Sequence, residues 1–251
     1  TAMKNALDSN GYEGKYIVQG FGTGELGGKL LEEGKKLEAD LVTMSTFYLQ
    51  SVQDANDMFL PLEFEVNTLE EFPDYCAPIT SQEGAILLNT ELLEQEGLPR
   101  PTCIKDLADP VYEGHLAVTD IQSSSTAWLL IQALVDAYGE DGAEETLAAI
   151  YKNAGDHIET SGSGPLKLCR AGEIAVGFGL HHQAVADKAD GLPIDFVDPA
   201  EGNFSLTESV AVIDKEDKTN PLAMEMAQCI IENGSEELQQ TYPNPLYEGE
   251  S

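Results

Sequence analysis

Hydroxyl side chains gather where apolar, strand-like runs give way to helical patterns. Two of these junctions carry several hydroxyls in a row, "SSST" at 123–126 and "TSGSG" at 160–164. Two shorter junctions are "GTG" at 22–24 and "ST" at 45–46. Serine and threonine cap helix N-termini, which explains any one of these residues. Four such junctions together exceed what capping needs, and helix N-termini flanked by hydroxyls also bind anions.

In open α/β sheets, junctions of this kind meet at the carboxyl ends of the strands. The four junctions therefore predict a cleft lined by hydroxyl and backbone donors, which suits a phosphate, phosphonate or carboxylate group. The residues that we assign to this cleft are Thr23, Gly24, Ser45, Thr46, Ser124, Ser125, Thr126, Ser161, Gly162 and Ser163.

A histidine pair, His181 and His182, follows the apolar run "EIAVGFGL" and begins the helical stretch "HHQAVADKAD". The pair could be catalytic, could ligate a metal, or could form one wall of a binding cleft. Adjacent residues on a helix point about 100° apart, so the two imidazoles rarely bind one ion without ligands from elsewhere. No HExxH pattern accompanies them. A histidine at a helix start that makes a single hydrogen bond is the plainer alternative.

Enzyme signatures are weak. "TSGSGP" lacks the first glycine of the GxSxG nucleophile motif, and "GTGELGG" is neither a Walker loop nor a complete dinucleotide fingerprint. The four cysteines show no CxxC spacing, which argues against a zinc or thioredoxin-like site and leaves one or two disulfides open. We therefore predict no catalytic activity, no cofactor and no resident metal. A hydrolase using Ser161 or Ser163 with a histidine is the remote alternative.

The chain is strongly acidic. It has 251 residues, with 45 Asp and Glu against 13 Lys and Arg, and a formal net charge of −32. Such a surface repels nucleic acids and anionic membranes, so neither is expected as a partner. A hydrophobic fraction of 42% indicates a folded globular protein. No apolar run reaches the roughly 18–20 residues of a membrane span.

Apolar runs typical of strands alternate with helical patterns, which predicts α/β architecture with mainly parallel sheets. Expected strands are "KYIVQGF", "DLVTMS", "GAILLN", "HLAVTD", "EIAVGFGL", "LPIDFV" and "ESVAVID". The stretch 55–84 reads as long and irregular, and a second connection at 197–208 carries Pro and Gly. If both are crossovers, 85–198 is an inserted lobe, and 1–84 with 199–251 forms the other. Because a parallel sheet rarely starts at a helix, we also expect a leader and a first strand to precede this chain.

Three long segments resemble the extracellular solute-binding proteins of bacterial ABC importers. They begin with "LADPVYEGHLAVTDIQSSSTAW", with "SGSGPLKLCRAGEIAVGFGLHHQAVADKADGLPIDF" and with "NPLAMEMAQCIIENG". The nearest branch of that family binds ferric iron, phosphonates such as 2-aminoethylphosphonate, sugar phosphates or thiamine. The resemblance implies the two-lobed type II periplasmic-binding fold, with a ligand cleft between the lobes that closes about a hinge.

The ligand-contacting positions of that family fall on the hydroxyl junctions named above, near His181 and His182, and around Glu208. The resemblance thus makes the histidines part of the cleft wall. Iron-binding members carry a tyrosine pair near this position, and imidazoles in place of phenolates remove the hard anionic oxygens that suit ferric iron. Arginine is scarce, with only Arg100 and Arg170. This scarcity argues against a polyphosphate and favours a zwitterion such as an aminophosphonate.

We therefore expect a substrate-binding receptor of an ABC importer that captures a small phosphonate, phosphorylated compound or similar zwitterion or anion. The alternative is a metal-ion binding protein on the same fold that uses His181, His182 and Glu208. The resemblance also implies a membrane permease as partner, a monomeric chain, and a place on the extracellular face of the cell membrane, held by a lipid anchor, or in the periplasm.

Overall fold

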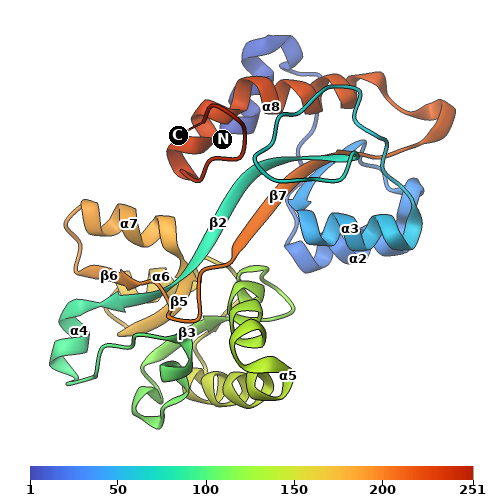
Figure 1. Cartoon of the computed structure of the whole chain (residues 1–251). Coiled ribbons are helices and arrows are strands. Elements are labelled where there is room, and N and C mark those ends of the chain that lie inside the picture. The colour runs from blue at the N-terminus through green and yellow to red at the C-terminus, as the bar shows by residue number, and fades with distance from the viewer. Residues whose placement is uncertain (251) are drawn as a thin grey trace. The chain divides into compact units, whose positions relative to one another are not determined.

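Figure 1 shows a computed structural model of the chain, in which residues 1–250 are described. The chain divides into two compact units: unit 1 is 1–81 with 207–251, and unit 2 is 82–206. Both passages between the units lie inside strands, β2 (Cys76–Asn89) and β7 (Ser205–Val212). Each unit packs helices against strands, so the α/β class predicted from the sequence is confirmed.

In unit 1, helices cover both faces of a sheet. Strand β1 (Leu41–Ser45) pairs antiparallel with β7, and β7 neighbours β2. Helices α2 (Thr23–Glu33) and α3 (Thr46–Asn56) pack against one face, whereas α8 (Pro221–Thr241) and α1 (Ala2–Leu7) pack against the other. The short helices of this unit are η1 (Asp8–Tyr12), η2 (Gly34–Lys36) and η5 (Glu216–Lys218).

The sequence "ESVAVI" explains why β7 lies between two helical layers. Ala211 belongs to the core under α2 and α3, whereas Val210 and Val212 belong to the core under α8. Successive side chains of a strand point to opposite faces. An unbroken apolar run is therefore typical of a strand that is buried on both sides.

In unit 2, three strands run parallel. Strand β3 (Leu116–Thr119) pairs in parallel with β4 (Ile158–Glu159) and with β5 (Val176–Leu180). The far half of β2 pairs antiparallel with β5 and with β6 (Ile194–Val197). The remaining short elements are α4 (Thr90–Gln95), η3 (Ile104–Ala108) and η4 (Pro110–Tyr112).

Helices also cover both faces of this second sheet. One face carries α5 (Thr126–Ala154), and the other carries α6 (Gly164–Arg170) and α7 (His181–Ala189). Helix α5 is bent at Gly139, whose φ of 71° and ψ of 176° are not helical. Glycine adopts this conformation without the strain that a β-carbon would add. The sequence "AYGED" therefore divides α5 into two arms.

The predicted strand "KYIVQGF" is wrong. Residues 16–22 form neither helix nor strand, and the side chains of Ile17 and Val18 are 91% and 61% exposed. Alternating apolar residues favour a strand only where a neighbouring strand accepts the backbone hydrogen bonds. Within residues 1–250, no strand pairs with this segment.

Two further expectations need correction. The stretch 55–84 is not irregular throughout, because β2 begins at Cys76 and includes "CAPITSQEG". Strand pairing is not mainly parallel either: β1, β2, β6 and β7 take part in antiparallel pairs. The alternation of helices and strands predicts parallel neighbours for β3, β4 and β5, where helices connect them. Strands β2 and β7 instead pass from one unit to the other, so their neighbours are not set by a helical crossover.

The four cysteines are free in this structure, and Cys76, Cys169 and Cys229 are buried. The disulfides that the sequence leaves open are therefore not formed here, and these thiols act as small core residues. Among residues 1–250, no helix combines the length and the apolar character that crossing a membrane requires.

Candidate functional site

Three helices of unit 2 begin at one edge of its sheet. Helix α5 follows β3, α6 follows β4, and α7 follows β5 directly. Because β3 runs parallel to both β4 and β5, the carboxyl ends of the three strands lie on the same side. This edge carries the predicted site residues Ser124, Ser125, Thr126, Ser161, Gly162, Ser163, His181 and His182.

Close packing at Gly162 joins two of these junctions. A β-carbon at this position would collide with Oγ1 of Thr126 and would lie 3.6 Å from Cδ1 of Leu180. The loop between β4 and α6 therefore rests on the first residue of α5 and on the last residue of β5. Within this loop, Oγ of Ser161 and Oγ of Ser163 are hydrogen-bonded at 3.1 Å. The first glycine of "TSGSG", Gly162, thus sets how closely the two hydroxyl clusters approach.

Asp120 organises the turn between β3 and α5. Its Oδ1 accepts hydrogen bonds from the backbone N–H of Gln122 at 2.9 Å and of Ser123 at 2.8 Å. Hydrogen bonds from the side chain and backbone of Ser123, and from Gln122, lower the pKa of Asp120. On the other side of the turn, the hydroxyl of Tyr151 donates to the carbonyl oxygen of Thr119 at 2.6 Å. The serines after Asp120 are therefore presented by a turn that is fixed at both ends.

Serine occupies the N-cap position of three helices but does not cap them. The side chains of Ser45, Ser125 and Ser163 make no hydrogen bond to α3, α5 or α6. Asparagine caps elsewhere in the chain: Asn89 accepts from the first turn of α4, and Asn220 accepts from that of α8, each at 3.0 Å. Capping is the ordinary reason for a serine at these positions. It does not account for these three hydroxyls.

The first amides of α5 are not free. The N–H of Ala127 donates to the carbonyl oxygen of Ser124 at 3.3 Å, and that of Trp128 donates to the carbonyl of Ser125 at 3.0 Å. Oγ of Ser124 is buried and accepts from the N–H of Thr126 at 3.3 Å. At this junction the groups left for another molecule are therefore side-chain hydroxyls, chiefly that of Ser125, rather than the helix amides.

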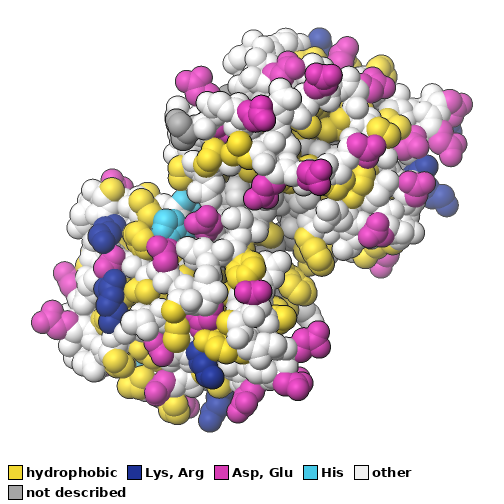
Figure 2. Space-filling model, in the orientation of Figure 1, with side chains coloured by type: hydrophobic (Ala, Val, Ile, Leu, Met, Phe, Trp, Pro, Cys, Tyr) yellow, Lys and Arg dark blue, Asp and Glu magenta, His cyan; other side chains and the backbone are white. Residues whose placement is uncertain are grey.

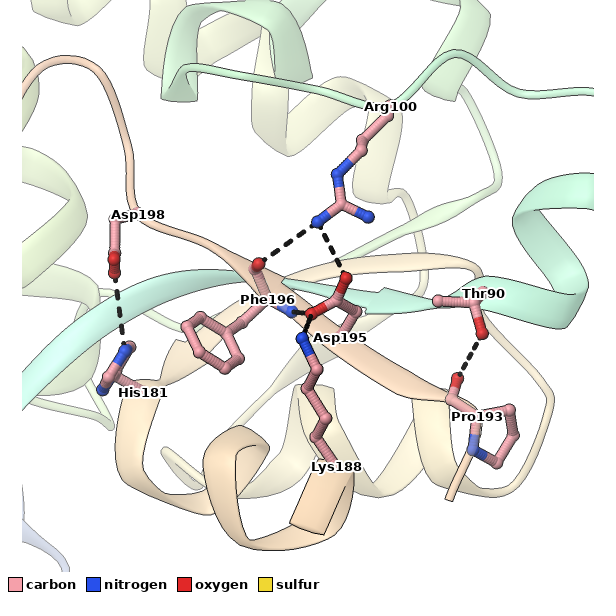
Figure 3. Close-up of polar contacts among 8 residues, drawn as sticks. All are labelled: Thr90, Arg100, His181, Lys188, Pro193, Asp195, Phe196 and Asp198. Atoms are coloured by element: carbon pink, nitrogen blue, oxygen red, sulfur yellow. Dashed lines mark hydrogen bonds and ion pairs between the residues drawn. The ribbon is translucent and has the colours of Figure 1, made fainter. Parts of the chain in front are cut away.

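The two histidines begin α7 and have different surroundings. Nε2 of His181 lies 3.5 Å from Oδ1 of Asp198, and its ring packs edge-on against Phe196 with ring centres 4.6 Å apart (Figure 3). Burial, and then the neighbouring His181, lower the pKa of His182. His182 is therefore neutral at pH 7, and His181 is oriented by an acidic and an aromatic neighbour.

An ion-pair group lies next to His181 along β6 (Figure 3). Asp195 accepts from Nζ of Lys188 at 2.8 Å and from a guanidinium nitrogen of Arg100 at 2.9 Å. Burial alone would raise the pKa of Asp195, but bonds from Lys188, from the N–H of Phe196 and from Arg100 lower it to about 2. This group joins the end of α7 to β6 and so supports the helix that carries the histidines.

Replacing Asp195 with asparagine is expected to lower the free energy of unfolding at pH 7 by about 1 kcal/mol, because solvent screens part of the ion pairing. A carboxyl whose folded pKa is depressed stabilises the protein above its unfolded pKa and loses that effect as the pH falls through the folded value. The deficit of D195N should therefore shrink between roughly pH 4 and pH 2. Denaturation curves across this range test it, with Asp190→Asn as control, because the carboxyl of Asp190 is exposed and directly follows α7. Equal losses in the two variants would contradict the assignment.

In unit 1, Ser45 ends β1 and Thr46 begins α3. Oγ1 of Thr46 donates to the carbonyl oxygen of Thr207 at 3.0 Å and is hydrogen-bonded to Oγ of Ser209 at 2.7 Å. Oγ of Ser45 and Oγ1 of Thr80 are buried without a hydrogen-bond partner among the described residues. An unsatisfied buried hydroxyl costs about 1–3 kcal/mol. Such groups mark places where a bound molecule or water supplies the missing bond.

Glu208 lies directly opposite Ser45 in the β1–β7 pairing. Burial raises the pKa of Glu208. Burial also raises the pKa of Tyr242, and the negative charge of Glu208 adds to that rise, so the two side chains lie near each other. A half-buried carboxyl in this position can accept a hydrogen bond from a hydroxyl or an ammonium group.

Thr23 and Gly24 are the first two residues of α2, which follows the N-cap Gly22. Both are half-buried. Helix α2 packs closely on α3, since a β-carbon at Gly27 would lie 3.1 Å from Cδ1 of Tyr48. Unit 1 thus holds Thr23, Gly24, Ser45, Thr46 and Glu208, whereas the other predicted site residues belong to unit 2.

Several buried or turn-forming polar residues were not anticipated from the sequence. Strand β2 buries Thr80, Ser81 and Gln82. The polar residues of this stretch suggested an irregular segment instead. No local pattern distinguishes a buried polar strand residue from one in a loop. Asp120 carries a clearer signal, because an aspartate directly after a strand commonly closes a turn by binding the amides that follow.

The surface bears out the acidic composition. Figure 2 shows Asp and Glu side chains spread over the visible face, with Lys and Arg in smaller number. Among residues 1–250, no group of three or more His, Cys, Asp and Glu side chains is placed to hold a metal ion.

Sequence comparison finds one matching family model and one curated relative. The family model of the bacterial extracellular solute-binding proteins matches residues 43–231. An uncharacterized protein of Haemophilus influenzae is 34% identical over 116 residues, which make up 46% of this chain and 33% of that protein. The chain therefore spans about a third of the length of the curated relative that it matches.

Solved structures of periplasmic binding proteins share the fold. AfuA from Actinobacillus pleuropneumoniae, with fructose-6-phosphate bound, is 21% identical, with a TM-score of 0.79 over 98% of this chain and 81% of AfuA. Iron-bound HitA from Pseudomonas aeruginosa is 19% identical, with a TM-score of 0.78 over 99% and 84%. A periplasmic thiamin binding protein is 17% identical, with a TM-score of 0.79 over 98% and 78%.

Identities this low show the fold and not the ligand. The fold is that of the two-lobed periplasmic binding proteins, as the resemblance in the sequence implied. Because the family model covers most of the chain, the family itself is also settled. This chain belongs to the bacterial extracellular solute-binding proteins.

Proposed function

We propose that this chain is the substrate-binding receptor of an ABC importer and that it captures a small phosphonate, phosphorylated compound or similar zwitterion or anion. The observation that carries the proposal is the set of N-cap serines, Ser45, Ser125 and Ser163, that do not cap their helices. Hydroxyl donors grouped at helix starts suit the oxygen atoms of a phosphoryl or phosphonyl group.

Each unit supplies part of such a site in this proposal. Unit 1 contributes Thr23, Gly24, Ser45 and Thr46, and unit 2 contributes the junctions at 124–126 and 161–163. The ligand is held when the two units close over it about a hinge, as the resemblance to the family implies. The unsatisfied, buried Oγ of Ser45 is the group with most to gain from a bound anion.

The other end of the ligand is polar and carries a hydroxyl or ammonium group. Glu208 can accept a hydrogen bond from either, and neutral His182 and its neighbour His181 can donate or accept. Only two arginines are present, Arg100 and Arg170, and each is engaged with an aspartate, Asp195 and Asp187. A ligand with one anionic group and a polar remainder therefore suits the site better than a polyphosphate.

The second candidate is a metal-ion binding protein on the same fold. It is favoured by the likeness to iron-bound HitA and by the histidine pair at the start of α7. Imidazoles suit softer metals than ferric iron. In this alternative His181, His182 and Glu208 would be ligands rather than the wall of an anion site.

We propose further that the chain is not an enzyme, acts as a monomer, and delivers its ligand to a membrane permease. Its place would be the periplasm, or the extracellular face of the cell membrane with a lipid anchor. These points rest on the family and on the chemistry of the ligand site. In particular, Oγ of Ser161 is hydrogen-bonded to Oγ of Ser163 rather than to a histidine, which supports binding rather than catalysis.

A thermal-shift panel tests the proposal. It would contain 2-aminoethylphosphonate, fructose 6-phosphate, thiamine, ferric citrate and divalent metal salts. A ligand that binds only the folded state stabilises it by about 2.7 kcal/mol at a hundredfold excess over Kd. We expect stabilisation by a phosphonate or sugar phosphate and none by metals. Stabilisation by metals alone would establish the second candidate instead.

A further inference from the structure

Glu159, the last residue of β4, turns its side chain over the start of α6. A β-carbon at Gly164, the first residue of α6, would collide with the β-carbon of Glu159. It would also lie 2.7 Å from Cγ and 2.8 Å from Oε2 of Glu159. The carboxylate is therefore packed against the backbone of Gly164, in the same loop as the hydrogen-bonded hydroxyls of Ser161 and Ser163. The glycine leaves the room that this carboxylate occupies.

The carboxylate of Glu159 has no partner in the part of the chain that the structure describes. Among residues 1–250 it forms neither a hydrogen bond nor an ion pair. The N–H of Gly164 donates to the carbonyl oxygen of Ser161 at 2.9 Å instead, and Lys167, one turn along α6, is not paired with it. Glu159 is half-buried. A charge that is partly removed from water without a partner is unfavourable, so packing alone does not explain a glutamate at this position.

The surroundings of Glu159 add negative charge rather than offset it. The N–H of Asp120 donates to the carbonyl oxygen of Glu159 at 2.8 Å, which places a second acidic residue beside the first. The two junctions that meet here, 119–128 and 159–166, contain no Lys and no Arg. A ligand whose charge is only negative would therefore meet carboxylates and no basic side chain from these segments. Like charges brought together in this way lower affinity, whereas a cationic group would raise it.

An ammonium group fits this loop. It has three hydrogen-bond donors, and the carboxylate of Glu159 and the hydroxyl oxygens of Ser161 and Ser163 are acceptors. A metal ion fits less well, because Mg²⁺ and Ca²⁺ take six or more oxygen ligands. No group of three or more His, Cys, Asp and Glu side chains among residues 1–250 is placed to hold one.

We propose that Glu159 determines specificity by binding the cationic nitrogen of a zwitterionic ligand. The inference rests on the proposed function, in which the N-cap serines hold the anionic group of the ligand. Glu159 then takes the ammonium end beside that group, and Gly164 keeps the carboxylate in place. The chain would thereby select aminophosphonates and related zwitterions over sugar phosphates and simple phosphonates, whose charge is only negative.

The test compares pairs of compounds that differ only in the amine. The first pair is 2-aminoethylphosphonate and ethylphosphonate, and the second is phosphoethanolamine and ethyl phosphate; fructose 6-phosphate is the fifth compound. Calorimetric titration gives Kd for the whole chain, for Glu159→Gln, and for Glu173→Gln as control. E159Q keeps the size of the side chain and breaks no hydrogen bond, and urea denaturation verifies that it is as stable as the wild type. Glu173 is exposed and follows α6 at its other end, so E173Q makes the same change of net charge away from the loop.

We expect the amine to improve binding by roughly tenfold or more in the wild type and in E173Q. In E159Q, the compounds with an amine should bind about tenfold more weakly and those without it no more weakly than before, so the preference is lost. A merely structural role would weaken both members of a pair. An amine preference that survives in E159Q, or fructose 6-phosphate bound as tightly as 2-aminoethylphosphonate, would overturn this proposal and leave the proposed function standing. No binding of any of the five compounds by the wild type would overturn both.

Discussion

The Ser45→Ala variant is expected to bind the ligand about tenfold more weakly while its free energy of unfolding stays the same or rises slightly. The hydroxyl of Ser45 is buried and bonds to no described residue, so its removal breaks nothing in the free protein. A hydrogen bond to a charged ligand group is worth about 1.5–3 kcal/mol, and 1.4 kcal/mol is a tenfold change in Kd. Calorimetric titration and urea denaturation measure the two quantities.

The matched control for this variant is Ser209→Ala. Oγ of Ser209 is hydrogen-bonded to Oγ1 of Thr46 at 2.7 Å and is fully buried. Its loss should therefore cost about 1 kcal/mol of stability and affect binding only through Thr46. If S45A were destabilised as much as S209A while it kept full affinity, the Ser45 hydroxyl would be a structural group, and the proposed site in unit 1 would be wrong.

The Gly162→Ala variant is expected to lose about 2 kcal/mol of stability and to lose ligand binding. Its β-carbon would collide with Oγ1 of Thr126, so the loop between β4 and α6 must move away from the start of α5. That movement separates the serines of 161–163 from those of 124–126. Urea denaturation and titration with ligand test the two effects. Gly28→Ala, in helix α2, is the control, because a β-carbon there meets nothing within 4 Å, and alanine favours a helix by about 1 kcal/mol.

A double-mutant cycle isolates the contact itself. Thr126→Ala removes the atom with which the new β-carbon collides. The G162A/T126A protein should therefore recover most of the stability that G162A loses, with a coupling of about 1–2 kcal/mol. Additive losses in the double variant would mean that the two junctions do not touch, and that the serine clusters of unit 2 are not one site.

The hydroxyl junctions were predictable because strand, loop and helix patterns meet there within a few residues. As expected, "DLVTMS" forms β1 and "HLAVTD" forms β3. Ser45 and Ser125 therefore fall at the starts of the helices that follow these strands. What their hydroxyls bond to was not predictable. Asn89 and Ser45 occupy the same kind of position, yet only Asn89 caps its helix. That difference depends on side-chain direction and on neighbours distant in sequence.

Strand partners were the weakest part of the prediction. "KYIVQGF" has the composition of a strand, but Ile17 and Val18 are exposed because no described strand pairs with them. "CAPITSQEG" has a proline and several polar residues, yet it is the first part of the 14-residue strand β2. Burial of Thr80 and Gln82 in that strand follows from the neighbouring chain and not from local pattern. Both errors arise because pairing joins residues far apart in the sequence.

The most direct test of the central claim is a ¹⁵N titration of the whole chain with 2-aminoethylphosphonate, fructose 6-phosphate and ferric citrate in turn. The claim is that the N-cap serines that do not cap their helices hold an anion. If so, one of the first two compounds should shift the amides around Ser45, Ser125 and Ser163 together, with saturation at one equivalent. Shifts confined to His181 and His182, and seen only with iron, would contradict the claim and make the chain a metal-binding protein.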